Sequence, residues 1–249
     1  MKRILVLGSG GQIGSELTMR LREIYGGSNV VATDINPARL TEAIQQSGPI
    51  AACDATKAEE IAAIVDKYQI DTIYNLVAIL SATAEKNPML GWNIGIGALI
   101  NCLEIAREKK CALFTPSSIG AFGDTTPLNG TPQDTIQRPK TIYGVTKVTG
   151  ELLGDYYFER FGVDARSVRF PGLISNVCPP GGGTTDYAVD PIQQLYAVHG
   201  SAVHTINEGF TDGNILSEER LADDVTSGKF DLYGQIIDFN DNTLGDYKI

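Results

Sequence analysis

The chain has 249 residues, of which 43% are hydrophobic and 20% are charged. This composition is that of an ordinary globular protein and excludes a disordered chain. The net charge of −10 disfavours nucleic acid and anionic membranes as partners, and no apolar run reaches membrane-spanning length, so we expect neither partner.

Cysteine and histidine usage argues against a disulfide framework and against a metal centre. The four cysteines (Cys53, Cys102, Cys111 and Cys178) are scattered with no C-x-x-C pair, and there are only two histidines. We expect buried, reduced thiols, no metal site and a cytoplasmic protein. The N-terminal "MKRILVLGSGG" is typical of a strand running into glycines, and we do not interpret it as a signal peptide.

Apolar runs of strand length alternate with amphipathic stretches of helical length. The strand-like runs cover 3–7, 30–33, 50–53, 72–78, 112–117 and 165–170. The helix-like stretches lie near 12–25, 37–46, 57–68, 88–108 and 141–160. This alternation is typical of βαβ units, and continuous apolar strands fit a parallel sheet covered on both faces. We predict an α/β fold with a doubly wound parallel sheet of the Rossmann type.

The pattern weakens from about residue 176, where Pro, Gly, Asp and Asn become more frequent. Residues 176–249 carry 12 Asp or Glu and 3 Lys or Arg, a net charge of −9, whereas the first 175 residues are close to neutral. We predict a Rossmann domain over 1–175, holding cofactor and catalytic residues, and a small substrate-binding region over 176–249.

A glycine-rich turn follows the first strand and opens the first helix. The usual G-x-G-x-x-G does not fit, because Ile13 takes the place of its last glycine, but Gly8, Gly11 and Gly14 form G-x-x-G-x-x-G. Glycines permit a tight turn and let backbone N–H groups approach a pyrophosphate at a helix N-terminus. A turn without a ligand is the alternative, and the position between strand and helix disfavours it.

Two aspartates end the next two strands. Asp34 follows Gly14 by 20 residues, where a carboxylate accepts both ribose hydroxyls of adenosine and repels a 2′-phosphate, which favours NAD over NADP. The alternative for Asp34 is a cap on the helix near Pro37. Asp54 is placed to reach the adenine amino group, and a plain turn aspartate is an equal alternative.

The stretch "TIYGVTK" contains Tyr143 and Lys147, four positions apart. On a helix this spacing places both side chains on one face. An ammonium there lowers the pKa of a phenol and makes it an acid/base; the alternative is a half-buried aromatic beside a solvated charge. Ser118, in "SSIGAFG", precedes Tyr143 by 25 residues.

Together the glycine turn, Asp34, Ser118 and the Y-x-x-x-K pair resemble the extended short-chain dehydrogenase/reductase family over about residues 1–190. The resemblance implies that Tyr143 removes a hydroxyl proton as hydride leaves for NAD. It also implies that Lys147 lowers the pKa of Tyr143 and binds the nicotinamide ribose, while Ser118 hydrogen-bonds the reacting oxygen. The implied NAD site comprises Gly8, Gly11, Gln12, Ile13, Gly14, Asp34, Ile35, Asp54, Ala55, Leu76, Ala78, Tyr143, Lys147 and Pro171.

Further strings are similar to short-chain-type L-threonine 3-dehydrogenases: "LSATAEKNP" (80–88), "TPQDTIQRP" (131–139), "FPGLIS" (170–175) and "PPGGGTTDYAV" (179–189). This similarity implies oxidation of L-threonine, a small amino acid, at its 3-hydroxyl to 2-amino-3-oxobutanoate. The substrate would be held by Ser81, Ser118, Tyr143, Thr184 and Thr185. The alternative for "GGGTT" is a flexible linker.

The chain also departs from the family pattern. Gly95 and Gly97 stand where the family usually has asparagines, one of which helps relay the proton outward, and the similarity fades beyond Val189. A nucleotide-sugar epimerase or dehydratase, which shares the fold and the triad, is one alternative, although the acidic last third is a poor place for a diphosphate. A catalytically weak NAD-binding scaffold is another. The family's habit of pairing through the helices near 88–108 and 141–160 implies a homodimer.

Overall fold

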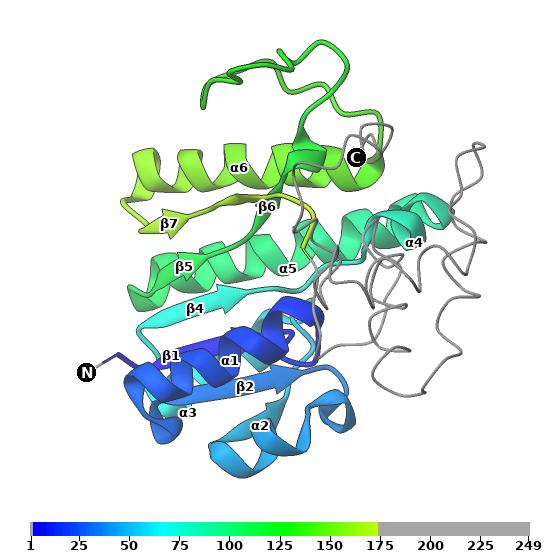
Figure 1. The fold of residues 1–249 in the computed structure, drawn as a ribbon. Coiled ribbons are helices and arrows are strands. Elements are labelled where there is room, and N and C mark those ends of the chain that lie inside the picture. Colours follow the sequence, from blue (N-terminus) through cyan, green and yellow to red (C-terminus); the bar gives the residue numbers. More distant parts are fainter. Residues whose placement is uncertain (1, 174–249) are drawn as a thin grey trace, which may run out of the picture. The chain divides into compact units, whose positions relative to one another are not determined.

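The computed structural model describes residues 2–173, which form most of the first of two compact units in the chain. The predicted division near residue 175 stays a prediction. Six strands form a parallel sheet in the order β3-β2-β1-β4-β5-β7. Figure 1 shows β2, β1, β4, β5 and β7 side by side. The strands are β1 (Ile4–Leu7), β2 (Val30–Asp34), β3 (Ile50–Ala52), β4 (Thr72–Asn75), β5 (Ala112–Phe114) and β7 (Ala165–Arg166).

Helices connect these strands and cover the sheet. They are α1 (Gln12–Tyr25), α2 (Glu42–Ser47), α3 (Ala58–Tyr68), α4 (Ser81–Lys86), α5 (Pro88–Lys109) and α6 (Ile142–Phe161), with short 3₁₀ turns η1 (Gly27–Asn29), η2 (Pro37–Arg39) and η3 (Ile119–Ala121). The chain moves outward from β1 to β3, then returns to the other side of β1 at β4. This reversal is the topological switch point of a doubly wound sheet, where ligands bind beyond the carboxyl ends of the strands. The predicted fold is confirmed.

The core lies on both faces of β1, because successive side chains of a strand point to opposite faces. Ile4 and Val6 pack in one cluster with Leu21 of α1. Leu5 and Leu7 belong to the larger cluster on the other face, which includes residues of α3, α5 and α6. In Figure 1, α1 lies in front of the sheet and α5 behind it.

Two of the predicted strands are each divided in two. The run 112–117 forms β5 and β6 (Ser117–Ser118), and the run 165–170 forms β7 and β8 (Arg169–Phe170), with β6 and β8 paired in a separate parallel ladder. Pro116 lies at the break and has no N–H to donate to a ladder. On either side of it, Thr115 N donates to Arg166 O at 3.0 Å and Ser117 N to Val168 O at 2.9 Å.

By length and composition, α5 is the one helix within residues 2–173 that is apolar enough to cross a membrane. About 44% of its most apolar window is buried within the molecule, where Cys102 and Leu103 are fully buried in the core. Packing against α3, α6 and the sheet accounts for the apolar residues of the buried part of the helix.

Candidate active site

The glycine turn brings the N-terminus of α1 close to the end of β1. Gly8 has a φ of +81°, and its N–H donates to Thr33 O at 3.0 Å. A Cβ on Gly14 would lie 2.1 Å from Gly8 O, so only glycine fits where the helix crosses the turn. Gly11 is the N-cap of α1 and makes no side-chain cap hydrogen bond. The first turn of α1 is therefore built as an anion-binding helix end of the kind that pyrophosphates occupy.

Asp34 ends β2 with its side chain turned to this loop. Gly10 N donates to Asp34 Oδ2 at 3.2 Å, and Asn36 N donates to Oδ1 at 3.0 Å. The cap on the following turn is Asn36, whose side chain accepts from Ala38 N, so the alternative role for Asp34 is wrong. A Cβ on Gly10 would lie 2.8 Å from Asp34 Oδ2. Because Gly10 has no side chain, the carboxylate of Asp34 can lie against the loop. The glycine motif did not indicate this role.

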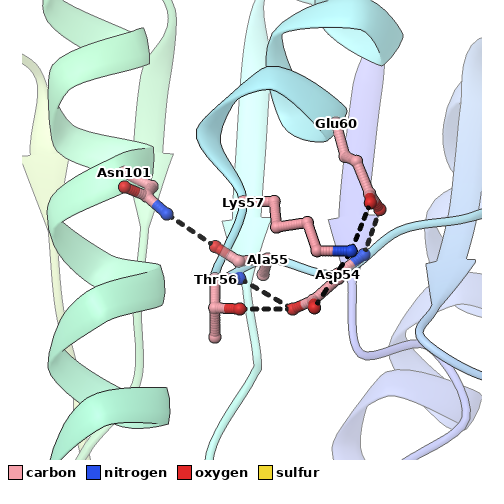
Figure 2. Close-up of polar contacts among 6 residues, drawn as sticks. All are labelled: Asp54, Ala55, Thr56, Lys57, Glu60 and Asn101. Carbon is pink, nitrogen blue, oxygen red and sulfur yellow. Dashed lines mark hydrogen bonds and ion pairs between the residues drawn. The ribbon is translucent and has the colours of Figure 1, made fainter.

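Asp54 follows β3 and is engaged in its own turn (Figure 2). Its Oδ1 accepts from Thr56 N at 3.0 Å and from Thr56 Oγ1 at 2.6 Å, and these bonds lower the pKa of the carboxyl. Glu60 Oε2 accepts from Asp54 N at 2.7 Å, and Asn101 of α5 donates to Ala55 O at 3.0 Å. Asp54 thus does hold a turn. Its contact with adenine, and the binding of the cofactor by Ala55, stay predictions.

The remaining predicted cofactor residues lie around the same edge of the sheet. Leu76 and Ala78 follow β4, and the carbonyl of Leu76 would lie 3.3 Å from a Cβ on Gly8. Ile13 is half-buried in the first turn of α1, and Ile35 is exposed directly after β2. Gln12 Nε2 donates to Leu173 O at 3.1 Å, near exposed Pro171, which follows β8.

Two glycines bring Ser118 and Tyr143 together. A Cβ on Gly144 would lie 2.2 Å from Gly120 O, so α6 meets the η3 turn at backbone distance. The ring of Tyr143 packs on Gly120, and Ser118 Oγ accepts from Gly120 N at 3.1 Å. Thr141 caps α6 by accepting from Gly144 N at 3.0 Å. The serine and the tyrosine thus share one side of the α6 N-terminus.

Lys147 lies one turn further along α6. Its ammonium donates to Pro116 O at 2.7 Å and lies 5.3 Å from the centre of the Tyr143 ring. Burial lowers the pKa of Lys147 to about 8. The interpretation of Lys147 as a solvated charge is therefore wrong, whereas the predicted proximity to Tyr143 is confirmed.

The pKa of Tyr143 differs from the expectation. Burial raises it above the ordinary value, and the hydrogen bond with Ser118 opposes that rise. A lowering by Lys147 is not seen, and the ammonium donates to the backbone of Pro116. Ser118 is thus the group that favours the phenolate here.

The predicted substrate residues are only partly described. Ser81 is the first residue of α4, a helix that packs on α6 and whose Glu85 accepts from Ile142 N at 2.6 Å. Ser81 thus belongs to an element that touches the start of the Tyr143 helix. Thr184 and Thr185 lie outside the described residues.

The described cysteines are buried thiols. Burial raises the pKa of Cys53 to about 12 and that of Cys111 to about 11. They therefore stay protonated and unreactive at neutral pH.

Sequence reasoning missed several residues that build this site. Gly10, Gly120 and Gly144 act through close approaches between distant segments, and only Gly10 could have been suspected from "GSGG". Glu151, one turn after Lys147 on α6, forms a half-buried ion pair with Arg169. Its position four residues after Lys147 was a usable signal, because it is the same spacing that links Tyr143 and Lys147.

The doubly wound sheet, the glycine turn under α1 and the carboxylate ending β2 define a Rossmann-type dinucleotide-binding protein. The serine, tyrosine and lysine at the carboxyl edge narrow the class to the short-chain dehydrogenase/reductase type. The model of the NAD dependent epimerase/dehydratase family matches residues 4–190, and the chain belongs to this family.

Relatives and solved structures agree with this assignment. A protein of Staphylococcus haemolyticus named as an uncharacterized epimerase/dehydratase is 57% identical over 190 residues, covering 76% of this chain and 59% of the relative. The crystal structure of L-threonine dehydrogenase from Clostridium difficile is 55% identical, with a TM-score of 0.73, covering 78% of this chain and 61% of that one. The holo form of a GalE-like L-threonine dehydrogenase from Cupriavidus necator is 45% identical, with a TM-score of 0.71, over 78% and 62% of the two chains. The present chain thus spans about three fifths of the length of these proteins.

NAD is the cofactor of this family, and the residues present fit it. Gly14 leaves room for the backbone approach that a pyrophosphate needs, and the N-terminus of α1 supplies N–H groups. Asp34, at the end of β2, would supply the carboxylate for the ribose hydroxyls.

Proposed function

We propose that the protein is an NAD-dependent L-threonine 3-dehydrogenase, which oxidises the 3-hydroxyl of L-threonine to 2-amino-3-oxobutanoate. The observation that carries the proposal is the arrangement of Ser118, Tyr143 and Lys147 at the carboxyl edge of the sheet, beside the glycine turn. The 55% identity with the L-threonine dehydrogenase of Clostridium difficile supports the choice of substrate.

Each of the three side chains has a distinct task in this mechanism. NAD, held by the glycine turn and Asp34, would supply the acceptor for the hydride that leaves the carbon carrying the hydroxyl. The phenol oxygen of Tyr143, as phenolate, takes the hydroxyl proton, and the Ser118 hydroxyl donates a hydrogen bond to the reacting oxygen. To Lys147, which is held by Pro116 O with its ammonium 5.3 Å from the centre of the Tyr143 ring, we assign the stabilisation of the phenolate once it forms in the reaction.

The substrate itself is a small zwitterion that must be oriented by hydrogen bonds. We assign this task to Ser81, at the start of α4, and to Thr184 and Thr185. A site built on hydrogen bonds rejects analogues that lack the partner group far more strongly than an apolar pocket does. The cytoplasmic location stays a prediction.

The proposal is tested with purified protein and NAD by following NADH absorbance after L-threonine is added, and then after a UDP-sugar. We expect NADH formation with threonine. No response to threonine together with conversion of the UDP-sugar would instead favour the epimerase alternative. No response to either would favour the weakly catalytic scaffold.

A substitution at the tyrosine tests the assigned base. Tyr143→Phe keeps the ring that packs on Gly120 but removes the oxygen, so kcat should fall by at least about a hundredfold while NADH binding persists. Near wild-type turnover in this variant would require another base.

We further propose a homodimer that forms through α5 and α6. Apolar side chains are exposed along these helices: Ile100 is 40% exposed on α5, and Val145, Leu152 and Tyr156 are 38%, 61% and 53% exposed on α6. The three α6 positions recur at intervals that place them along one helix face. A second copy that presents the same face would bury all of them.

A further inference from the structure

A half-buried ion pair lies one helical turn beyond Lys147. Arg169 donates from Nε to Glu151 Oε1 at 2.9 Å and from Nη2 to Oε2 at 2.7 Å, and the two side chains are only 17% and 14% exposed. Ser117 Oγ also donates to Oε1, and Gln137 Nε2 donates to Oε2 at 2.7 Å. The carboxylate is therefore fully supplied with donors and held in one orientation.

The carboxylate of Glu151 and its three donor residues come from separate parts of the chain. Glu151 belongs to α6, Arg169 to β8 and Ser117 to β6, while Gln137 lies in the segment before α6. Arg169 continues the network by donating to Gln133 O at 2.8 Å. One carboxylate thus joins the helix of Tyr143 to the short strand that contains Ser118.

A cavity of about 30 Å³ lies between α5, α6 and the strand ends. Gly95 of α5, Lys147 and Glu151 line it, and these last two are the only charged residues in its described lining. A space of this size holds only about one water molecule. Glu151 is only 14% exposed and Lys147 is half-buried, so their charges are less screened from each other than they would be in water.

The charged and titratable neighbours of Lys147 are few. Its own helix contributes Tyr143 and Glu151, and β8 contributes Arg169, which is already paired with Glu151. The residues that α5 and β4 add to the cavity lining are uncharged: Asn75, Gly95, Ile96 and Leu99. Glu151 is thus the one carboxylate placed to act on the lysine among the described residues.

We propose that Glu151 is a positioning residue for the reaction, holding the Ser118 strand against α6 and stabilising the ammonium form of Lys147. This inference rests on the proposed function of Ser118, Tyr143 and Lys147. The hydrogen bond between Ser117 and Glu151 links the two segments that carry the catalytic side chains. Ser117 directly precedes Ser118, and Glu151 follows Lys147 by one turn of α6.

Removing the charge of Glu151 should lower the pKa of Lys147. Burial lowers the pKa of Lys147 to about 8, and the charge of Glu151 opposes this decrease. Removing the carboxylate leaves burial unopposed, so Lys147 loses its proton at a lower pH. The phenolate then loses its positive neighbour within the working pH range.

The test measures the titration of Lys147 directly. The ¹³Cε resonance of Lys147, identified by its disappearance in Lys147→Met, is followed against pH in the full-length protein without substrate. In Glu151→Gln the midpoint should fall by about one pH unit or more, the size of effect that a close opposite charge exerts. Glu151→Asp, which keeps the charge, should restore most of the wild-type midpoint.

A second variant guards against loss of the fold. Glu151→Gln leaves Arg169 buried without its partner, whereas Glu151→Gln/Arg169→Met removes both charges, a replacement that buried pairs often tolerate. The midpoint should fall in this double variant as well. Asp164→Asn is the matched control. It also breaks a two-pronged carboxylate–arginine pair, between Asp164 just before β7 and Arg166 of β7, and neither residue lines the cavity.

An unchanged Lys147 midpoint in both Glu151→Gln and the double variant would overturn the proposal. In the active protein, the alkaline limb of the kcat–pH profile should move to lower pH together with the midpoint, while Asp164→Asn leaves it in place. The titration needs no substrate, so it decides this inference even if threonine is not oxidised and the proposed function fails.

Discussion

Gly14 and Gly11 occupy the same loop but meet different surroundings. A Cβ on Gly14 would lie 2.1 Å from Gly8 O and 2.7 Å from Ser9 Cα, both of which are backbone atoms. A Cβ on Gly11 would meet Gly8 O at 3.4 Å, an ordinary contact. We expect Gly14→Ala to destabilise the protein by about 1–3 kcal/mol, the usual cost of overpacking, and to prevent NADH binding.

Thermal unfolding and NADH titration check this prediction, with Gly11→Ala as the matched control that keeps the fold. Equal thermal stability of the two variants would show that the turn relaxes more easily than its geometry indicates. A stable Gly14→Ala protein that binds NADH normally would contradict the placement of the cofactor over this loop.

Among single residues, the sequence predicted those whose role depends on local spacing. Tyr143 and Lys147 were identifiable because a four-residue interval on a helix determines that they share a face. Gly120 and Gly144 were not, because their role depends on two segments meeting at backbone distance. The pKa of Tyr143 was mispredicted for a related reason, since burial outweighs a lysine that is bonded elsewhere.

Among the elements, α5 carries glycines with contrasting environments. A Cβ on Gly91 would lie 3.0 Å from the Cβ of Ala84 on α4, whereas one on Gly95 would lie 3.9 Å from Thr146. Gly95→Ala should therefore stabilise the protein by about 0.5–1 kcal/mol, because alanine costs less conformational entropy in a helix than glycine. Gly91→Ala should give no such gain, since α4 would have to move.

Parallel melting curves of the two alanine variants measure this difference. For a chain of this size, 1 kcal/mol corresponds to a shift of about 2–4 °C in Tm. A Gly91→Ala protein as stable as Gly95→Ala would mean that α4 yields at little cost.

The existence of most elements was predictable, but their limits were not. Apolar runs indicated the strands of the sheet most clearly at its centre, where β1 and β2 are buried along their whole length. The division at Pro116 was visible in the sequence as a missing donor, yet the apolar run continues through it. Helix α4 was missed because six residues are too few to display a helical period.

For the whole molecule, the proposed homodimer can be tested at the exposed face of α5 and α6. Changing Leu152 and Tyr156 to glutamate places two charges where a second copy would pack, so the proposed dimer should dissociate to monomers. Ile24→Glu, at a residue 56% exposed on α1, is the control and should leave the mass unchanged. Light scattering after gel filtration gives the mass of each variant. A monomeric wild-type protein would refute the dimer.

The bond between Lys147 and Pro116 has a consequence for the order in which the site is assembled. Since the break in the ladder leaves the Pro116 carbonyl available, the lysine ammonium is anchored by the fold itself, before any ligand arrives. Fixing a lysine side chain costs up to about 1.5–2 kcal/mol of conformational entropy. Here that cost is met during folding, so the binding of a cofactor begins from a lysine that is already immobilised.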